Sequence, residues 1–469
     1  MSDLSWAGLA ILLGAALFPW IYRAPIRGVY LITLALPLIV SPPLPLLGRK
    51  LALVDLFIVV TALAWGARQL LVPAARRPLR LDPKLYIPLG LYYLVALASF
   101  QNTLSPLWSG IELLSMIYLG LGFFLVIQII SDKRELENIL KLWMISAVAV
   151  VLFGLVQMAS LYTGLWQDKL LWFHTKQRIT STFNFPNQLP SYLATITPVF
   201  FYYIARGRTA WLRGGALLFA ITSAIVMLAT ASRTAVGLII ALVALYWGWS
   251  LIEGRKKRGR LPLRPLLAGA AVVLLLLASV FALRANTWGI YTRLRQVPSI
   301  GRALDIVRNL DLKQIDNERY LMYSVGFQAV REHPWVGVGI GSFRFFYLRT
   351  PGGYPHEMHS NLLSLLAETG GLGFLAFMSF IGVLLWYGKR VAFDLKDDRW
   401  RHLGATLVIG FVTNFFVYGA FLLGLRERHL WLSMALIVSL VNLSRGMDPS
   451  PSSSPKRRGE LITEGSQTT

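Results

Sequence analysis

Long apolar stretches alternate with short polar and basic segments along most of this chain. A helix of about 20 apolar residues crosses a hydrocarbon core of ~30 Å, so the pattern predicts a bundle of membrane-spanning helices. About thirteen candidate spans follow from it, at residues 4–22, 27–47, 51–72, 84–101, 111–131, 138–163, 187–205, 211–231, 234–252, 264–283, 360–388, 402–423 and 429–444. The run Pro42-Pro43-Leu44-Pro45 leaves open whether the second span is complete or bends into a short re-entrant pair.

Three segments are too polar for this pattern. Residues 284–358 form an insert of about 75 residues, which is too long for a simple connector, so we expect a small folded cap there. A shorter polar segment lies at 164–186. The end of the chain, 447–469, is rich in Ser, Pro, Lys and Arg and is expected to be disordered. We therefore divide the chain into transmembrane helices at 1–283, the loop or cap at 284–358, transmembrane helices at 359–446 and the tail.

Basic residues set the expected orientation. The loops after odd-numbered spans carry most of the Lys and Arg, and the run at 255–260, RKKRGR, is the strongest marker. The positive-inside rule places such loops in the cytoplasm. The C-terminus is then cytoplasmic, the loops after even-numbered spans are outside, and an odd number of spans puts the N-terminus outside as well.

Composition supports a multi-pass membrane protein and removes several function classes. The 469 residues are 55% hydrophobic, and mean hydropathy is +0.56. The net charge of +23 is explained by the basic loops, so nucleic acid is not an expected partner. With no cysteine, disulfides and thiol chemistry are excluded. The sequence has no Walker A motif, no Gly-x-Ser-x-Gly elbow and no Asp-x-Asp pair, so we expect neither a metal nor another cofactor.

Ionisable side chains near the outer membrane boundary are the functional candidates, because such groups are costly at membrane depth. The first stretch, RITSTFNFPNQLPSYL at 178–193, places Arg178 before a turn and Asn187 at the start of a span. These side chains could bind phosphate or sugar hydroxyls. The alternative is a loop end whose arginine lies at the headgroup level.

Two further arginines recur at the same boundary. Arg233 stands in the tight turn 232–234 between two spans, either as a snorkelling side chain or as a ligand that holds phosphate bidentately. Arg319 begins an apparently amphipathic helix that His333-Pro334 ends. The glycines of 337–341 indicate close backbone approach, with a turn packed against a helix as the simplest explanation.

The stretch HEMHSNLLSLLAETGGLG, at 356–373, combines an imidazole with a carboxylate. A helix beginning at Ser360 or Asn361 puts Glu368 about 12 Å along its axis from His359, which excludes a direct acid–base pair. Glu368 is therefore expected to be structural, pairing with an arginine or bonding a helix across the bundle. His359 lies at the outer interface, either as a general base or as a helix cap.

Arginines and one histidine on the outer face match a specific chemistry. Guanidinium groups can stabilise a diphosphate leaving group without a metal, and imidazole can accept the proton of an acceptor hydroxyl. A polyprenyl-linked glycan would supply the energy through its own diphosphate bond.

The order of the motifs resembles the O-antigen ligase/polymerase superfamily. The motifs are R-x-T-x-T-F-x-x-P-N at 178–187, S-R-T at 232–234, Arg319 with H-P-x-x-G-V-G at 333–339, and H-x-N at 359–361 followed by Glu368. The resemblance covers roughly 170–440, with a large outer loop before the histidine helix. Members of the family usually have twelve spans with both ends inside, from which the odd number expected here departs.

The resemblance implies an inverting, metal-independent glycosyltransferase with a GT-C-like helical fold in the bacterial inner membrane. It implies an undecaprenyl-pyrophosphate-linked glycan as donor. By the same analogy Arg233 and Arg319 would hold the pyrophosphate, Arg178 would assist them, and His359 would activate the acceptor. Asn187, Asn361 and Glu368 are left as supporting residues.

Three activities share these motifs. An O-antigen ligase transfers the glycan to lipid A-core, a polymerase joins repeat units into a growing glycan, and a protein O-oligosaccharyltransferase uses a protein hydroxyl. We place the ligase first and the polymerase second. A transporter of lipid-linked sugars is the alternative from another class, but paired repeats and broken midplane helices, typical of transporters, are not evident in the sequence.

Overall fold

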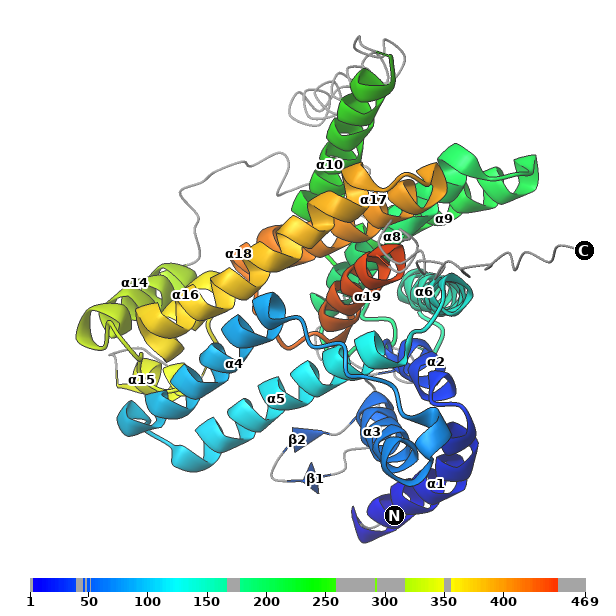
Figure 1. Cartoon of the computed structure of the whole chain (residues 1–469). Helices are drawn as coiled ribbons and strands as arrows, with labels where there is room; N and C mark the ends of the chain where they lie inside the picture. Colours follow the sequence, from blue (N-terminus) through cyan, green and yellow to red (C-terminus); the bar gives the residue numbers. More distant parts are fainter. Residues whose placement is uncertain are drawn as a thin grey trace, which may run out of the picture.

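The computed structural model describes residues 3–38, 45–46, 49–50, 52–166, 178–258, 292, 317–349 and 356–445. Within them the fold is a helical bundle (Figure 1). Its α-helices are α1 (Asp3–Arg23), α2 (Ile26–Ala35), α3 (Leu53–Leu71), α4 (Pro83–Ala98), α5 (Pro106–Ile129), α6 (Lys133–Thr163), α8 (Gln188–Arg206), α9 (Ala210–Ala229), α10 (Arg233–Arg258), α14 (Asn317–Glu332), α15 (Phe343–Leu348), α16 (Asn361–Lys389), α17 (Asp398–Val412), α18 (Gly419–Phe421) and α19 (Arg428–Arg445).

Shorter elements join these helices. Two 3₁₀ turns, η1 (Pro73–Ala75) and η2 (Ser99–Asn102), flank α4. Two π-helical segments, η4 (Arg390–Asp394) and η5 (Thr413–Tyr418), follow α16 and α17. Strands β1 (Pro45–Leu46) and β2 (Arg49–Lys50) form one small antiparallel pair.

The expected all-α polytopic architecture is confirmed. Eight of the described helical stretches are long and apolar enough to cross a membrane. The predicted helix at Arg319 is α14, which ends at Glu332, just before the His333-Pro334 pair. Predicted spans agree with helix bounds to within a few residues from α3 onward. The predicted span 264–283 and the tail 447–469 lie outside the described residues.

The second predicted span is wrong in its C-terminal half. The pattern extended it to residue 47, but α2 ends at Ala35. Proline has no N–H to continue a helix and clashes with the preceding turn, and prolines occur at 37, 42, 43 and 45. In place of helix, Pro45 pairs with Lys50 across the small hairpin.

Side-chain contacts define two ends of the bundle. We call one the basic end, where termini of six helices are linked by the ion pairs Arg445–Asp82, Lys133–Asp397, Arg206–Asp398 and Lys257–Asp398. We call the other the site end, which comprises residues 99–109, 178–188, 230–233, 333–342, 356–361 and 422–428. These loops are the ones that charge predicts to lie on a single outer face.

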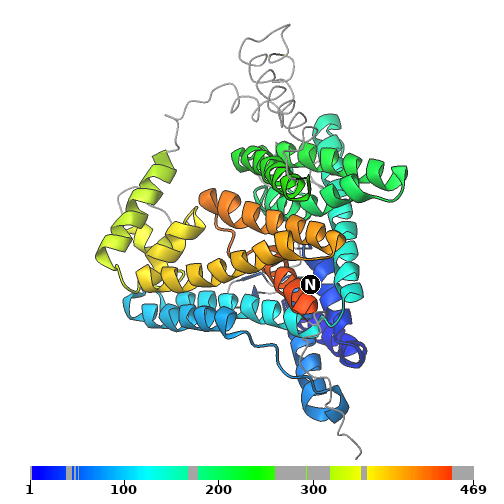
Figure 2. The ribbon, with the colours of Figure 1, turned by 45° about the horizontal axis from the view of Figure 1, so that its top comes forward.

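The site end lies at the tips of several helices of the bundle. Helix α16 packs along α4, while α14 and α15 lie beyond their tips (Figures 1 and 2). Aromatic rings join α5, α16 and α19 in the core, with Phe123, Phe380 and Trp431 in mutual contact at 5.7–6.3 Å between ring centroids. Lipid is as apolar as these side chains, so their close packing stabilises the bundle chiefly through dispersion.

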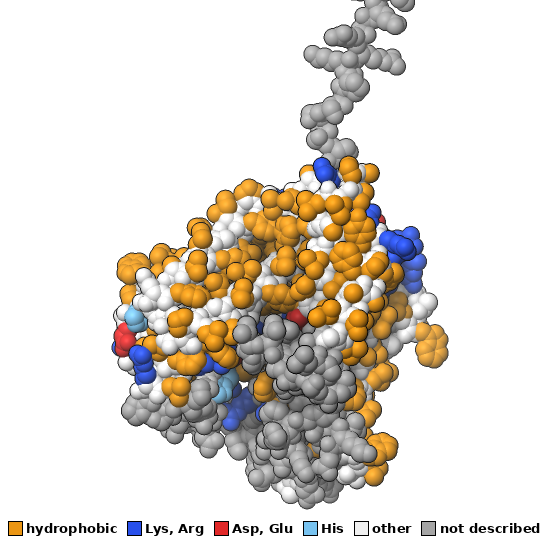
Figure 3. Space-filling model, turned by 90° about the horizontal axis from the view of Figure 1, so that it is seen from below, with side chains coloured by type: hydrophobic (Ala, Val, Ile, Leu, Met, Phe, Trp, Pro, Cys, Tyr) orange, Lys and Arg blue, Asp and Glu red, His pale blue; other side chains and the backbone are white. Residues whose placement is uncertain are grey.

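An apolar surface separates the two ends. Figure 3 shows hydrophobic side chains over the middle of one face, with charged side chains and histidines gathered toward its two sides. Large side chains such as Leu114 on α5 and Leu375 on α16 are more than half exposed. This band has the character of a lipid-facing surface.

Candidate functional site

His359 stands directly before α16. The Ser360 hydroxyl accepts a hydrogen bond from the Leu363 N–H at 3.4 Å, which satisfies one of the open donors of the first turn. The helix therefore begins at Asn361, as predicted. Glu368 lies seven residues further along this helix, so the separation of imidazole and carboxylate is confirmed.

Helix α14 fixes the backbone of His359 on both sides. The Tyr323 hydroxyl donates to the His359 carbonyl at 3.1 Å, and the His359 N–H donates to the Met322 sulfur at 3.3 Å. The His356 ring meets the His359 ring edge to face, with centroids 4.6 Å apart. Because the main chain makes these bonds, the half-buried imidazole is held in place while its ring stays available.

The surroundings keep this imidazole neutral. Burial lowers the pKa of His359 to about 4, and the nearby charges of His356 and Arg319 act in the same direction. Arg319 lies one helical turn before the two α14 residues that contact His359, so its charge is near the imidazole. Arg319 is half-buried and makes no ion pair with any residue the structure describes. Arg319 is therefore a cation without a described counter-ion beside a base that is unprotonated at pH 7.

A partly buried ion network lies behind His359. Arg426 pairs with Glu112 of α5 and with Glu357, whose Oε1 accepts from Arg426 Nη1 at 2.5 Å. Glu357 also pairs with Arg344, whose guanidinium lies 4.3 Å from the centroid of the Trp108 ring. Burial alone would lower the pKa of Arg426, but these carboxylates and Glu368 raise it, so Arg426 remains charged.

The glycines of 337–341 meet a break in α16. Gly370 has φ +66° and lies in the left-handed region, where glycine carries no steric penalty. A Cβ on Gly370 would lie 2.3 Å from the Trp335 carbonyl carbon, and one on Gly337 would lie 2.4 Å from the Glu368 carbonyl carbon. The predicted close backbone approach is confirmed.

Backbone hydrogen bonds lock this junction. Gly371 N donates to Pro334 O at 2.7 Å and Leu372 N donates to Trp335 O at 3.1 Å. In the opposite direction, Val338 N donates to Ala367 O at 2.9 Å, and Gly339 N donates to Glu368 O at 3.1 Å. The groups freed by the break are satisfied by the loop, so the first turns of α16 are joined rigidly to the end of α14.

Glu368 lies in surroundings that are compatible with a structural role. It is buried, and it shares a small cavity of about 20 Å³ with Glu112 and Arg426. Its carboxylate also interacts with the backbone of Gly341. Arg426 supplies a positive charge nearby, although its ion pairs are with Glu112 and Glu357.

Asn361 positions the loop that bears Arg426. Its side chain is fully buried, with Oδ1 accepting from Gly424 N at 2.7 Å and from Leu425 N at 3.2 Å. Its Nδ2 donates to Phe415 O at 3.3 Å, within the π-helical segment η5. The supporting role predicted for Asn361 therefore has a definite form.

Arg178 and Asn187 are joined to the turn before α10. Arg178 Nε donates to Thr230 O at 2.7 Å and Nη2 donates to Asn187 Oδ1 at 3.1 Å. Arg233 follows this turn, exposed at the first residue of α10. It makes no ion pair with a described residue, and no described contact joins it to His359.

A second contact links the Arg178 segment to the ion network. Gln188, next to Asn187, donates to Glu427 at 3.3 Å, and Glu427 adjoins Arg426. Thus Arg178, Arg233 and His359 lie at the site end, and Arg319 lies beside it on α14. Among the described residues, no three His, Asp or Glu side chains are grouped as a metal site would require.

A family comparison bears on this geometry. Residues 216–378 match the family model described as O-antigen ligase. This match supports the resemblance to the O-antigen ligase/polymerase superfamily that the motifs indicated. The matched O-antigen ligase domain contains Arg233, Arg319 and His359. No curated protein matches the chain.

Several residues of the site lie outside the matched segment. Others lie near a predicted site residue but were not predicted from the sequence. Arg426 and Glu112 are 314 positions apart, and no local motif relates them. Glu357 and His356 lie within the HEMH stretch, but only the second histidine was interpreted. One feature of the sequence could have pointed to Arg426. Arginines occur at 426 and 428 in a very short loop predicted to be outside, where the positive-inside rule makes cations unexpected.

Proposed function

We propose that this protein is an inverting, metal-independent glycosyltransferase that uses an undecaprenyl-pyrophosphate-linked glycan as donor. The observation that carries the proposal is the pairing of a neutral imidazole, His359, with Arg319, a cation that has no described counter-ion. A base for an acceptor hydroxyl and a ligand for a diphosphate are thereby adjacent. An O-antigen ligase domain that contains both residues supports the same reaction class.

Arg319 and Arg233 would hold the diphosphate. The guanidinium fork matches phosphate oxygens geometrically and does not lose its proton. Neither side chain has an ion pair with a described carboxylate, so each can take up an anion without breaking an existing pair. Arg178 is already bonded to Thr230 and Asn187, so we assign it to positioning the turn that presents Arg233.

His359 would act during the attack on the sugar. The acceptor oxygen forms a bond to the anomeric carbon while the bond to the diphosphate oxygen breaks, and the diphosphate departs with the electron pair. The acceptor proton passes to the imidazole. Bound diphosphate would offset the Arg319 charge and raise the pKa of His359, so the base becomes stronger when the donor is present.

The acceptor we place first is lipid A-core, which makes the protein an O-antigen ligase. A repeat-unit polymerase is second, a protein O-oligosaccharyltransferase third and a lipid-linked sugar transporter last. The matching description and the full set of Arg233, Arg319 and His359 favour the ligase. We place the reaction at the periplasmic face of the inner membrane, with the C-terminus in the cytoplasm, because the site end lies opposite the basic end.

The test is a transfer assay with purified protein in detergent. It supplies a polyprenyl-diphosphate-linked glycan, EDTA, no nucleotide, and one of three acceptors: lipid A-core, a short repeat unit or a peptide. We expect product with lipid A-core, its loss in His359→Gln, and its retention in His333→Gln, which changes a histidine at the end of α14.

Three results would count against the proposal. A strict need for Mg²⁺ contradicts the metal-free scheme, and full activity of His359→Gln removes the base. Movement of the donor across vesicles without any new glycosidic bond favours the transporter.

A further inference from the structure

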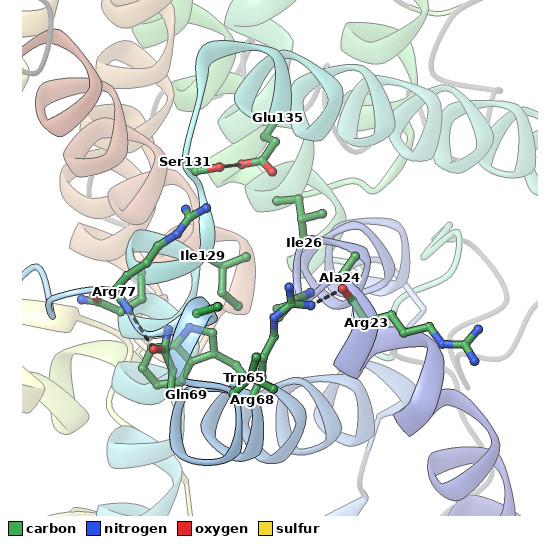
Figure 4. Close-up of a pocket in the computed structure, with 14 residues that line it drawn as sticks. Arg23, Ala24, Ile26, Trp65, Arg68, Gln69, Arg77, Ile129, Ser131 and Glu135 are labelled. Atoms are coloured by element: carbon green, nitrogen blue, oxygen red, sulfur yellow. Dashed lines mark hydrogen bonds between the residues drawn. The ribbon is translucent and has the colours of Figure 1, made fainter.

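A second cavity lies at the basic end, away from the residues considered so far. It has a volume of about 360 Å³. Its walls come from the turn between α1 and α2, the last turns of α3, the segment after it, and the turn between α5 and α6. Figure 4 shows the space between these elements. No part of the proposed glycosyl transfer uses this cavity.

Two arginines direct positive charge into the space. In Figure 4 the guanidinium group of Arg68 extends into the cavity from below and that of Arg77 from the left, whereas that of Arg23 points away from it. Arg68 uses Nη1 to donate to Tyr22 O at 2.9 Å and to Arg23 O, and its Nε and Nη2 make no bond with a described residue. The Arg77 guanidinium likewise has no partner among the described residues.

The one carboxylate in the lining is already satisfied. Glu135 Oε2 accepts from Ser131 N at 2.7 Å and from Ser131 Oγ at 2.8 Å. It forms no ion pair with either cavity arginine. The two guanidinium groups in the cavity therefore keep unused N–H donors, and no described carboxylate neutralises their charge.

An independent sign of excess positive charge comes from Arg80, in the segment that leads to α4. Burial lowers the pKa of Arg80, and the charge of Arg77 lowers it further, against a smaller opposite effect of Glu135. Arg80 Nη1 is fixed by the carbonyls of Ile127 and Ile130, so it cannot move away from Arg77. An anion bound at Arg77 would relieve this repulsion.

Part of the cavity lining is apolar. It includes Trp65, Ile26 and Ile129, and the Trp65 ring meets the Phe124 ring edge to face at 5.8 Å. Trp65 lies about 4.5 Å deeper along α3 than Arg68, at ~1.5 Å rise per residue. The apolar ring of Trp65 therefore lies on the membrane-interior side of the Arg68 charge.

We propose that this cavity binds the phosphate headgroup of an anionic phospholipid. Arg68 and Arg77 would hold the phosphate, and Trp65 would contact the glycerol and the start of the acyl chains. A lipid fits better than free phosphate because the site is amphipathic in the same direction as the bilayer. Basic pockets at the cytoplasmic side of helical bundles favour such headgroups, at about 1 kcal/mol for each basic residue.

The experiment compares lipid binding by the whole protein and matched variants. Delipidated protein in neutral detergent is titrated with phosphatidylglycerol or phosphatidylcholine, and bound lipid is counted by native mass spectrometry. Arg77→Gln removes a cavity cation, and Arg23→Gln removes the same charge from a side chain that points away. About 1 kcal/mol corresponds to a roughly fivefold weaker affinity for phosphatidylglycerol in Arg77→Gln, with no loss in Arg23→Gln.

Further arms separate the alternatives. The double variant Arg68→Gln, Arg77→Gln should lose roughly thirtyfold, and its thermal unfolding in detergent shows whether it stays folded. Equal binding of the two lipids, or equal loss in Arg77→Gln and Arg23→Gln, overturns the proposal. Inorganic phosphate that displaces phosphatidylglycerol at equal concentration would identify a soluble anion as the ligand and also overturn it.

Discussion

Replacing Arg319 should make His359 easier to protonate. In the wild-type protein the pKa of His359 is lowered to about 4 from 6.5, by burial first, then by His356 and by Arg319. At pH 5.5 a pKa of about 4 leaves roughly 3% of the imidazole protonated, whereas a pKa of 6.5 would leave about 90%. Loss of a neighbouring cation favours imidazolium, so Arg319→Gln moves the pKa upward.

In Arg319→Gln the pKa of His359 should rise only part of the way from about 4 to 6.5, because burial is the larger cause of the low pKa and remains in the variant. The assay is an NMR pH titration of protein labelled with ¹³C at its six histidines, with His359→Gln to assign the signal. Arg331→Gln is the matched control, since it removes the same charge from the last turn of α14.

Two outcomes would refute the reasoning. A wild-type midpoint near 6.5 would mean that the imidazole is neither desolvated nor close to a cation. Identical midpoints in Arg319→Gln and Arg331→Gln would mean that Arg319 does not act on His359. We expect kcat/KM for transfer to fall with acidification only below pH 6 in the wild type, as His359 becomes protonated. In Arg319→Gln the same fall should begin at a higher pH.

Three further changes test the site and its frame. Arg319→Lys should lower transfer more than tenfold while leaving the protein folded, because an ammonium cannot reproduce the bidentate fork; activity near that of the wild type would remove the diphosphate role. Gly370→Ala should lower the unfolding temperature, at a cost of roughly 1–3 kcal/mol for the strained φ plus the clash, whereas Gly382→Ala, with open space around it, should not; equal effects would contradict the close approach. Arg428→Gln leaves buried Asp55 without its bidentate partner at 2.7–2.8 Å, so we expect a loss of roughly 3–5 kcal/mol in unfolding free energy, and a loss below about 1 kcal/mol would show that the pair is dispensable.

Local patterns predicted most of the helices. Apolar runs bounded by charge give α3, α9 and α16 to within two residues, because the bilayer imposes both length and apolarity on each span. The same rule failed at α2, where apolar residues continue but prolines stop the helix at Ala35. A hydropathy pattern reflects how apolar the side chains are. It does not reveal that proline lacks the backbone N–H that a helix needs.

The candidate site was only half accessible from the sequence. His359 and Arg319 were found because each stands alone at a predicted membrane boundary. The Arg426 network was not, because its members contribute to one site from three separate segments, at 112, 357 and 426. These residues form an ion network only because the fold brings them together. A single sequence does not show which distant residues will meet.

The break in α16 at Gly370 has a consequence for how the site can diversify. Four hydrogen bonds between main-chain groups hold it, and they require only that no side chain intrude at two glycines. Side chains of α14 and α16 that make no contact across the junction can therefore be exchanged without breaking these four bonds. A protein built this way can vary the surface around its site while its scaffold remains fixed.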